Sequence, residues 1–140
     1  MKHQRPSITL KNITKADSHF LYSLLIERDP LVNISHKKMP TYKNHLKFVM
    51  SKPYSKWYII KSKNQSMGSI YLSKQNEIGI FIKKGMQGKG IGKISMQLLM
   101  KKNPRKRYLA NVNPKNIKSI KFFKKNGFRL IQYTYELTKC

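Results

Sequence analysis

The sequence predicts a single domain of mixed α/β class, in which a mixed, mostly antiparallel sheet is flanked by helices. Its 140 residues give room for one domain, residues 1–140, and no second. Hydrophobic residues make up 39% of the chain and aromatic residues 11%, which is enough to build a packed core. Short β-branched and aromatic runs alternate with helical patterns, first as a meander and later as a parallel crossover.

The N-terminal elements are predicted to be one strand and two helices. Residues 7–13 alternate apolar and polar side chains loosely enough for a first strand. Residues 14–17 (TKAD) match a capping box that opens a helix, and the Asp29-Pro30 pair ends it because a residue before proline is pushed out of the α region. Residues 31–40 are irregular, and a short helix is predicted over Tyr42–Met50.

The sheet is predicted to continue as a meander. Residues 57–60 and 69–72 are β-branched and aromatic runs separated by a polar turn at residues 63–66, which is the pattern of an antiparallel hairpin. Residues 77–83 form a further strand. The connection before it is short enough to make this strand an antiparallel neighbour in the same sheet.

The second half is predicted to contain a glycine loop and then helix, strand, helix and strand. The loop at residues 86–92 leads into a helical pattern, and residues 108–112 form a fifth strand. A helix over residues 115–126 follows, which Gly127 closes as a C-terminal cap. Residues 128–137 are predicted to form a last strand or a tight pair of strands.

The chain is strongly basic, with 30 Lys and Arg against five Asp and Glu and a formal net charge of +25. Only five of the thirty are Arg, the residue favoured for reading bases and clamping phosphates. The lysines are scattered along the chain, and no segment concentrates them as a basic tail would. Composition bias is therefore favoured over a dedicated nucleic-acid surface, while the positive field attracts polyanionic ligands in general.

The sequence gives no indication of disulfide, membrane or metal chemistry. The single cysteine, Cys140, excludes an intramolecular disulfide, so a cytoplasmic setting is expected. No apolar run has the length of a signal peptide or of the ~20 residues that span a membrane. The four histidines never fall at the spacing that places two ligands on one helical face, so no metal site is expected.

The glycine loop carries the clearest chemical signal. Gly88, Gly90 and Gly92 let the backbone bend tightly, so successive N–H groups can converge on one anion beside a helix N-terminus. This arrangement favours a diphosphate. The third glycine comes too early for the dinucleotide pattern G-x-G-x-x-G, and Ile91 stands where a P-loop has its lysine. The pattern that fits is Q-x-x-G-x-G, which starts at Gln87.

Two blocks together resemble the GNAT superfamily of acetyl-CoA-dependent N-acetyltransferases. The first is the loop Q-x-x-G-x-G, and the second, about twenty residues later, contains Asn116, Ser119 and the Gly127-Phe128 pair. With the order of strands and helices, the resemblance covers essentially the whole chain. It implies a GNAT-like sheet in which two parallel strands, here residues 77–83 and 108–112, splay apart at the cofactor cleft.

The resemblance implies that acetyl-CoA is the acetyl donor, with no metal. The backbone amides of the loop would bind its pyrophosphate, helped by the side chain of Lys89 or Lys93, and the strand around Phe81 would pair with the pantetheine arm. For Asn116 the alternative is a helix-start residue that bonds its own backbone. The implied cofactor-binding residues are Ile80, Phe81, Ile82, Gln87, Gly88, Lys89, Gly90, Ile91, Gly92, Lys93, Asn111, Asn116, Ser119 and Phe123.

The reaction implied is direct attack of an amine on the thioester, which needs a base for the amine and a place for the thiolate. Glu77 matches the position of a general-base glutamate in some members; the alternative is a strand-end acid with Lys partners. Many members supply a tyrosine as general acid where this chain has Phe123. The thiolate then leaves unprotonated or is protonated through water, or Tyr108, Tyr133 or Ser119 substitutes.

The acceptor is expected to bind between the first helix and the hairpin. The helix around His45 looks like one found in acetyltransferases of surface-polysaccharide and nucleotide-aminosugar pathways, and His36 and Trp57 are weaker candidates for contacting substrate. A nucleotide-linked amino sugar or another anionic amine suits the charge, whereas a polyamine would be repelled. The alternative is a basic nucleic-acid-binding module, or an RNA- or ribosome-directed acetyltransferase, on the same fold. The protein is expected to be a monomer or homodimer.

Overall fold

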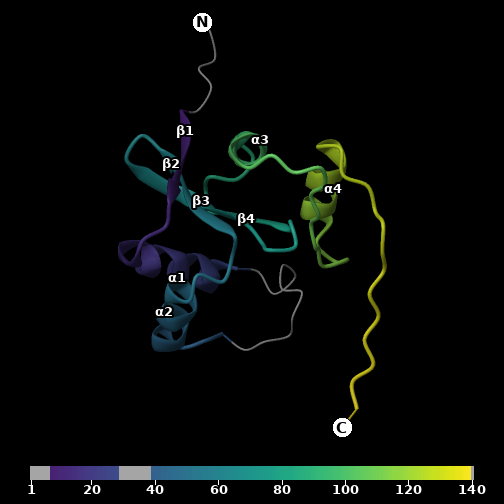
Figure 1. The fold of residues 1–140 in the computed structure, drawn as a ribbon, viewed down its shortest axis with the longest axis horizontal. Coiled ribbons are helices and arrows are strands. Elements are labelled where there is room, and N and C mark those ends of the chain that lie inside the picture. The colour runs from purple at the N-terminus through teal and green to yellow at the C-terminus, as the bar shows by residue number, and fades with distance from the viewer. Residues whose placement is uncertain (1–6, 29–38, 140) are drawn as a thin grey trace, which may run out of the picture.

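The computed structural model describes residues 7–28 and 39–139, and its elements follow the order that the sequence predicts (Figure 1). These elements are β1 (Ile8–Asn12), the 3-10 turn η1 (Lys15–Asp17), α1 (Ser18–Glu27), α2 (Tyr42–Met50), β2 (Lys56–Ser62), β3 (Gln65–Leu72), β4 (Ile78–Ile82), α3 (Ile91–Lys102) and α4 (Ile117–Lys125). The Asp29-Pro30 pair lies outside the described residues. Arg28 is the C-terminal cap of α1.

The predicted antiparallel meander is confirmed. β1, β2, β3 and β4 are neighbours in that order in one sheet, and every pair is antiparallel. The hairpin between β2 and β3 is tighter than expected, because strand pairing extends to Ser62 and Gln65. Its turn therefore has two residues, and Lys63 accommodates it with a positive φ of 54°.

Helices cover both faces of this sheet, as the alternation of apolar residues requires. Ile60, Ile70 and Leu72 are fully buried in a core that includes Leu99 of α3. The neighbouring residue Ile59 points the other way and packs with apolar residues of α1 and α2. Figure 1 shows the same arrangement, with α3 on one side of the sheet and the α1–α2 pair on the other.

The capping box predicted at residues 14–17 is present, although it opens a 3-10 turn before α1 begins. The backbone N–H of Thr14 donates to the Asp17 carboxylate at 2.8 Å, and the Lys11 ammonium binds the same oxygen at 2.8 Å. Burial alone would raise the pKa of Asp17, but these two hydrogen bonds outweigh it and the pKa lies below its usual value. The turn therefore fixes how β1 joins α1.

The predicted strand at residues 108–112 is wrong in extent, because only one bridge forms. Leu109 pairs in parallel with Glu77, with Ile78 N–H donating to Leu109 O at 2.7 Å and Leu109 N–H donating to Asn76 O at 2.9 Å. Beyond Leu109 the described chain makes no further ladder bond to β4. The two segments therefore part immediately, which is the splayed parallel pair that the fold class implies.

The C-terminal part also differs from the prediction. α4 is shorter than residues 115–126, because Asn116 forms a turn with Asn113 and caps the helix through a bond from Ser119 N–H to its side chain at 3.2 Å. Gly127 ends α4 with a φ of +92°, as predicted. The predicted strand at residues 128–137 is wrong, since after the Phe128 N–H donates to Phe123 O at 2.9 Å the segment is extended and forms no strand pairing with another described segment.

The core beneath α3 predicts a stability effect. Leu99 is fully buried, so Leu99→Ala leaves a cavity and is expected to lower the free energy of unfolding by about 2–5 kcal/mol, measured by urea denaturation. Gln97→Ala is the matched control, because Gln97 is exposed on the same helix. Equal stabilities of the two variants would contradict the packing described.

Candidate active site

The glycine loop connects the end of β4 to α3. Two of its glycines adopt the left-handed backbone conformation that a tight bend requires. Gly88 and Gly90 both have φ of +78°, and a Cβ at either position would meet open space. Gly90 is the N-cap of α3, and no side chain caps this helix. The N–H groups of the first turn therefore have no internal acceptor and face a surface loop.

Gly92 differs from these two glycines. A Cβ at Gly92 would lie 3.2 Å from the Phe122 ring and 3.7 Å from Ile80, so this glycine lets α4 pack against the start of α3. Lys89 and Lys93 are exposed beside the loop, while Ile91 is buried in the core. The Gln87 amide donates to Ile82 O at 3.2 Å and so ties the loop to the end of β4.

β4 presents an open backbone edge next to this loop. Ile78 directs its backbone toward Leu109, and alternate residues of a strand direct theirs to the same edge. Ile80 and Ile82 therefore present their N–H and C=O groups where no strand follows among the described residues. Phe81 lies between them and turns its side chain to the α1–α2 face.

Glu77 precedes β4 at the point where the two segments part. Its carboxylate accepts from the Ser73 hydroxyl at 3.0 Å and from the side-chain amide of Asn111. The alternative of lysine partners for Glu77 is not observed among the described residues, where the one salt bridge joins Lys11 and Asp17. Asn111, which is expected to bind the cofactor, links the separated segment to the Glu77 carboxylate.

An aromatic wall lines the α1–α2 face beside Glu77. The Tyr71 ring lies over Gly79, and the Tyr54 ring stacks on Tyr71 with centroids 3.8 Å apart. Burial raises the pKa of both phenols, so each keeps its proton and can donate a hydrogen bond. The Arg28 guanidinium lies 5.4 Å from the centre of the Phe81 ring, which adds a positive charge to the wall.

Two of the three residues predicted to contact substrate line a cavity of about 90 Å³ against this wall. The side chain of His45 is 4% exposed, and its Nε2 has no hydrogen-bond partner among the described residues. The same holds for Trp57 Nε1. Burial lowers the pKa of His45, which is therefore held neutral. His36 lies outside the described residues.

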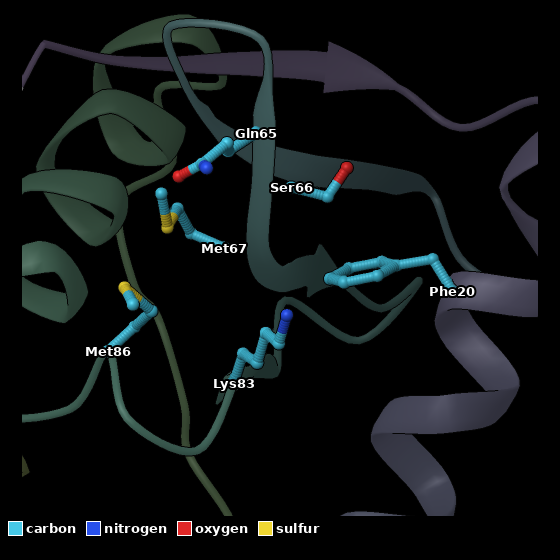
Figure 2. Close-up of a pocket in the computed structure, with 6 residues that line it drawn as sticks. All are labelled: Phe20, Gln65, Ser66, Met67, Lys83 and Met86. Carbon is cyan, nitrogen blue, oxygen red and sulfur yellow. The ribbon is translucent and has the colours of Figure 1, made fainter.

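A larger cavity of about 320 Å³ was not predicted from the sequence. Figure 2 shows it at the start of β3 and the end of β4, with the Lys83 ammonium and the thioethers of Met67 and Met86 directed toward it. Phe20 of α1 closes another side. Its lining comes from segments far apart in the sequence, so no local pattern could indicate it.

The remaining candidate residues have structural partners of their own. The Tyr108 hydroxyl donates to Asn103 O at 2.7 Å and accepts from Arg105 N–H at 2.9 Å. Phe123 packs against Phe122 and Phe128, with ring centroids 5.2 and 5.1 Å away. Asn116 caps α4, in line with the alternative given for it, and its cap bond joins it to Ser119. Tyr133 is 73% exposed on the C-terminal segment.

In residues 7–28 and 39–139, no three His, Cys, Asp or Glu side chains lie close enough to hold a metal ion together. Within the same ranges, no helix combines the length and the apolar character needed to span a bilayer.

The chain is similar to known acetyltransferases. Residues 19–128 match the model of the acetyltransferase (GNAT) family, and the chain belongs to this family. The peptidyl-lysine N-acetyltransferase YjaB of Escherichia coli (strain K12) is 28% identical over 74 residues, which are 53% of this chain and 49% of that protein. The match therefore spans about half the length of that relative.

Solved structures share nearly the whole architecture. A domain from Methanocaldococcus jannaschii DSM 2661 is similar with a TM-score of 0.79 and 28% identity, over 94% of both chains. The yncA protein of Salmonella typhimurium, solved with its cofactor acetyl-CoA, is similar with a TM-score of 0.70 and 15% identity, over 90% of this chain and 82% of that one. The second likeness is one of fold alone.

The buried His45 predicts a pH dependence of stability. The folded state holds His45 neutral, whereas the unfolded chain takes up a proton below the ordinary pKa of 6.5. The free energy of unfolding is therefore expected to fall as the pH drops below 6.5, and His45→Gln should remove part of this slope in chemical denaturation. His19→Gln, an exposed histidine on α1, is the control. Identical slopes for wild type and His45→Gln would refute the assignment.

Proposed function

We propose that this protein transfers an acetyl group from acetyl-CoA to a primary amine. The observation that supports this most is the open backbone edge of Ile80 and Ile82, which leads directly to the uncapped N-terminus of α3. The edge suits the amide-bearing pantetheine arm, and the N–H groups from Gln87 to Lys93 suit the pyrophosphate. Exposed Lys89 and Lys93 add charge for the same phosphates.

The proposed catalytic base is Glu77. It accepts the proton that the amine loses as its nitrogen bonds to the thioester carbonyl carbon and the C–S bond breaks. Ser73 and Asn111 hold the carboxylate, so its orientation is set before the substrate arrives. Phe123 offers no proton where many relatives have a tyrosine, and the CoA thiolate therefore leaves as the anion and is protonated by solvent.

The proposed acceptor is an anionic amine, such as a nucleotide-linked amino sugar. The chain carries a net charge of +25, which attracts anions and repels polyamines. The cavity beside the site adds flat aromatic rings and the unpartnered His45 Nε2 and Trp57 Nε1, which can exchange hydrogen bonds with a polar ring. A nucleic-acid-binding module remains the alternative for the same charge.

Acetyl-CoA binding is predicted to depend on Gly90. Gly90→Glu puts a carboxylate among the loop amides and is expected to abolish binding, measured by calorimetric titration at low and high salt. Gly127→Glu is the matched control, because Gly127 also has a positive φ and open space around its Cα. Wild-type affinity in a folded Gly90→Glu protein would contradict the loop assignment. Loss of all ligand binding at high salt would favour the nucleic-acid alternative.

The acetyl-transfer rate is predicted to depend on the charge of Glu77. Glu77→Gln keeps the side-chain shape but cannot take a proton, so kcat is expected to fall by about 10²–10⁴-fold while acetyl-CoA affinity is kept. The measurement is CoA release with a panel of amines, starting with nucleotide amino sugars and including spermidine. The control is Glu27→Gln, which changes a different acid that lies at the end of α1. An unchanged kcat in Glu77→Gln would remove Glu77 as the base.

A further inference from the structure

The larger of the two cavities described above lies apart from the open edge of β4. It has a volume of about 320 Å³ and lies where β3 begins and β4 ends (Figure 2). One edge of β4 pairs with β3, and Ile80 and Ile82 present the other, open edge. The first residues of β3 line the cavity, so it lies on the paired side of β4 and leaves the open edge free.

A β-bulge in β3 helps to build this cavity. Two successive residues of β2 pair with Gly68 and Ser66, so Met67 has no partner on β2. In a regular strand Met67 would point to the face opposite Ile70, because side chains alternate between the two faces. The bulge instead turns Met67 into the same core as Ile70, beside the cavity. Bulges occur often next to functional sites, where they redirect a side chain in this way.

A turn at the end of β4 forms another wall of the cavity. The Met86 N–H donates to Lys83 O at 3.0 Å and closes the turn. The Lys83 N–H donates to Met67 O at 2.8 Å, which fixes the turn to the bulge. The Lys84 N–H donates to the Glu27 carboxylate at 2.8 Å, which fixes it to α1. The walls are therefore held in place by the chain itself.

The lining combines one cation with apolar side chains. The Lys83 ammonium is directed toward the cavity and has no hydrogen-bond or ion-pair partner among the described residues. The thioethers of Met67 and Met86 are directed toward it as well, and Phe20 closes another side. None of the described residues that line the cavity is acidic. A single ammonium complements one carboxylate, and thioethers make favourable contacts with aromatic rings.

We propose that this cavity binds a small aryl carboxylate, a molecule with one flat ring and one negative charge. The carboxylate accepts hydrogen bonds from the Lys83 ammonium, and the ring lies between Phe20 and the two thioethers. The volume is at the lower end of the range of about 300–1,000 Å³ for small-molecule sites, so a single ring suits it better than a nucleotide. This binding does not depend on the acetyl-transfer proposal.

The test is a titration of the full chain with phenylacetate, followed by NMR of ¹³C-labelled methionine methyl groups. Saturable shifts are expected for the signals of Met67 and Met86. The signal of Met50, which is exposed on α2, should not move. Phenylacetamide, which has no charge, and acetate, which has no ring, should each bind about tenfold more weakly or less.

Lys83→Gln removes the positive charge and is expected to weaken phenylacetate binding by about tenfold or more. The matched control is Lys84→Gln. It removes the same charge from the neighbouring exposed lysine, which does not line the cavity, and keeps the backbone bond to Glu27. Its affinity for phenylacetate should equal that of the wild type. Saturating acetyl-CoA should also leave this affinity unchanged. The titration without acetyl-CoA reports on the cavity even if the protein binds no acetyl-CoA.

Several results would overturn the proposal. One is the absence of saturable shifts at Met67 and Met86. Another is binding of phenylacetamide as tight as that of phenylacetate, or unchanged binding in Lys83→Gln, because the ammonium would then have no part in recognition. A third is an equal loss of affinity in Lys84→Gln, which would make the effect one of overall charge. A fourth is displacement of phenylacetate by acetyl-CoA, since the cavity would then belong to the cofactor site.

Discussion

The parting of the chain segments after the single Glu77–Leu109 bridge is the constraint on which the rest of the structure depends. Two backbone hydrogen bonds hold the segments together, and directly beyond them β4 has a free edge. The glycine loop and the N-terminus of α3 lie at the far end of this edge, and the Glu77 carboxylate lies at its near end. The same parting leaves Ala110 with an unpaired outer edge. The open edge of β4, the position of the Glu77 carboxylate and the unpaired edge at Ala110 thus have one geometric origin.

Acidic side chains serve here mainly as hydrogen-bond acceptors that connect segments. Asp17 holds the turn before α1, and Glu27 at the end of α1 accepts from Lys84 N–H at 2.8 Å, next to the glycine loop. Glu77 joins β4 to the segment of Asn111. With five acids against thirty bases, little charge is neutralised within the chain, so bound anions are expected to lower its self-repulsion.

Features set by local sequence could be predicted, and features set by distant partners could not. The capping box, the hairpin, the Gly127 cap and the left-handed Gly90 follow from a few adjacent residues, and the structure has them all. The strands at residues 108–112 and 128–137 have suitable composition, yet a strand exists only where a partner lies. Neither pattern states whether one is available. The larger cavity and the Glu77–Asn111 contact escaped prediction for the same reason, because each joins residues far apart in the sequence.

The Tyr71 ring over Gly79 has an evolutionary consequence. The two residues face each other across β3 and β4, and any Cβ at position 79 would overlap the ring. Tyr54 stacks on the same ring, so Tyr71 cannot move away without losing that partner. Positions 71 and 79 should therefore vary together among relatives of this chain. A larger residue at position 79 should occur only where position 71 has lost its aromatic ring, and the shape of the cavity that Tyr54 and Tyr71 line would change in the same step.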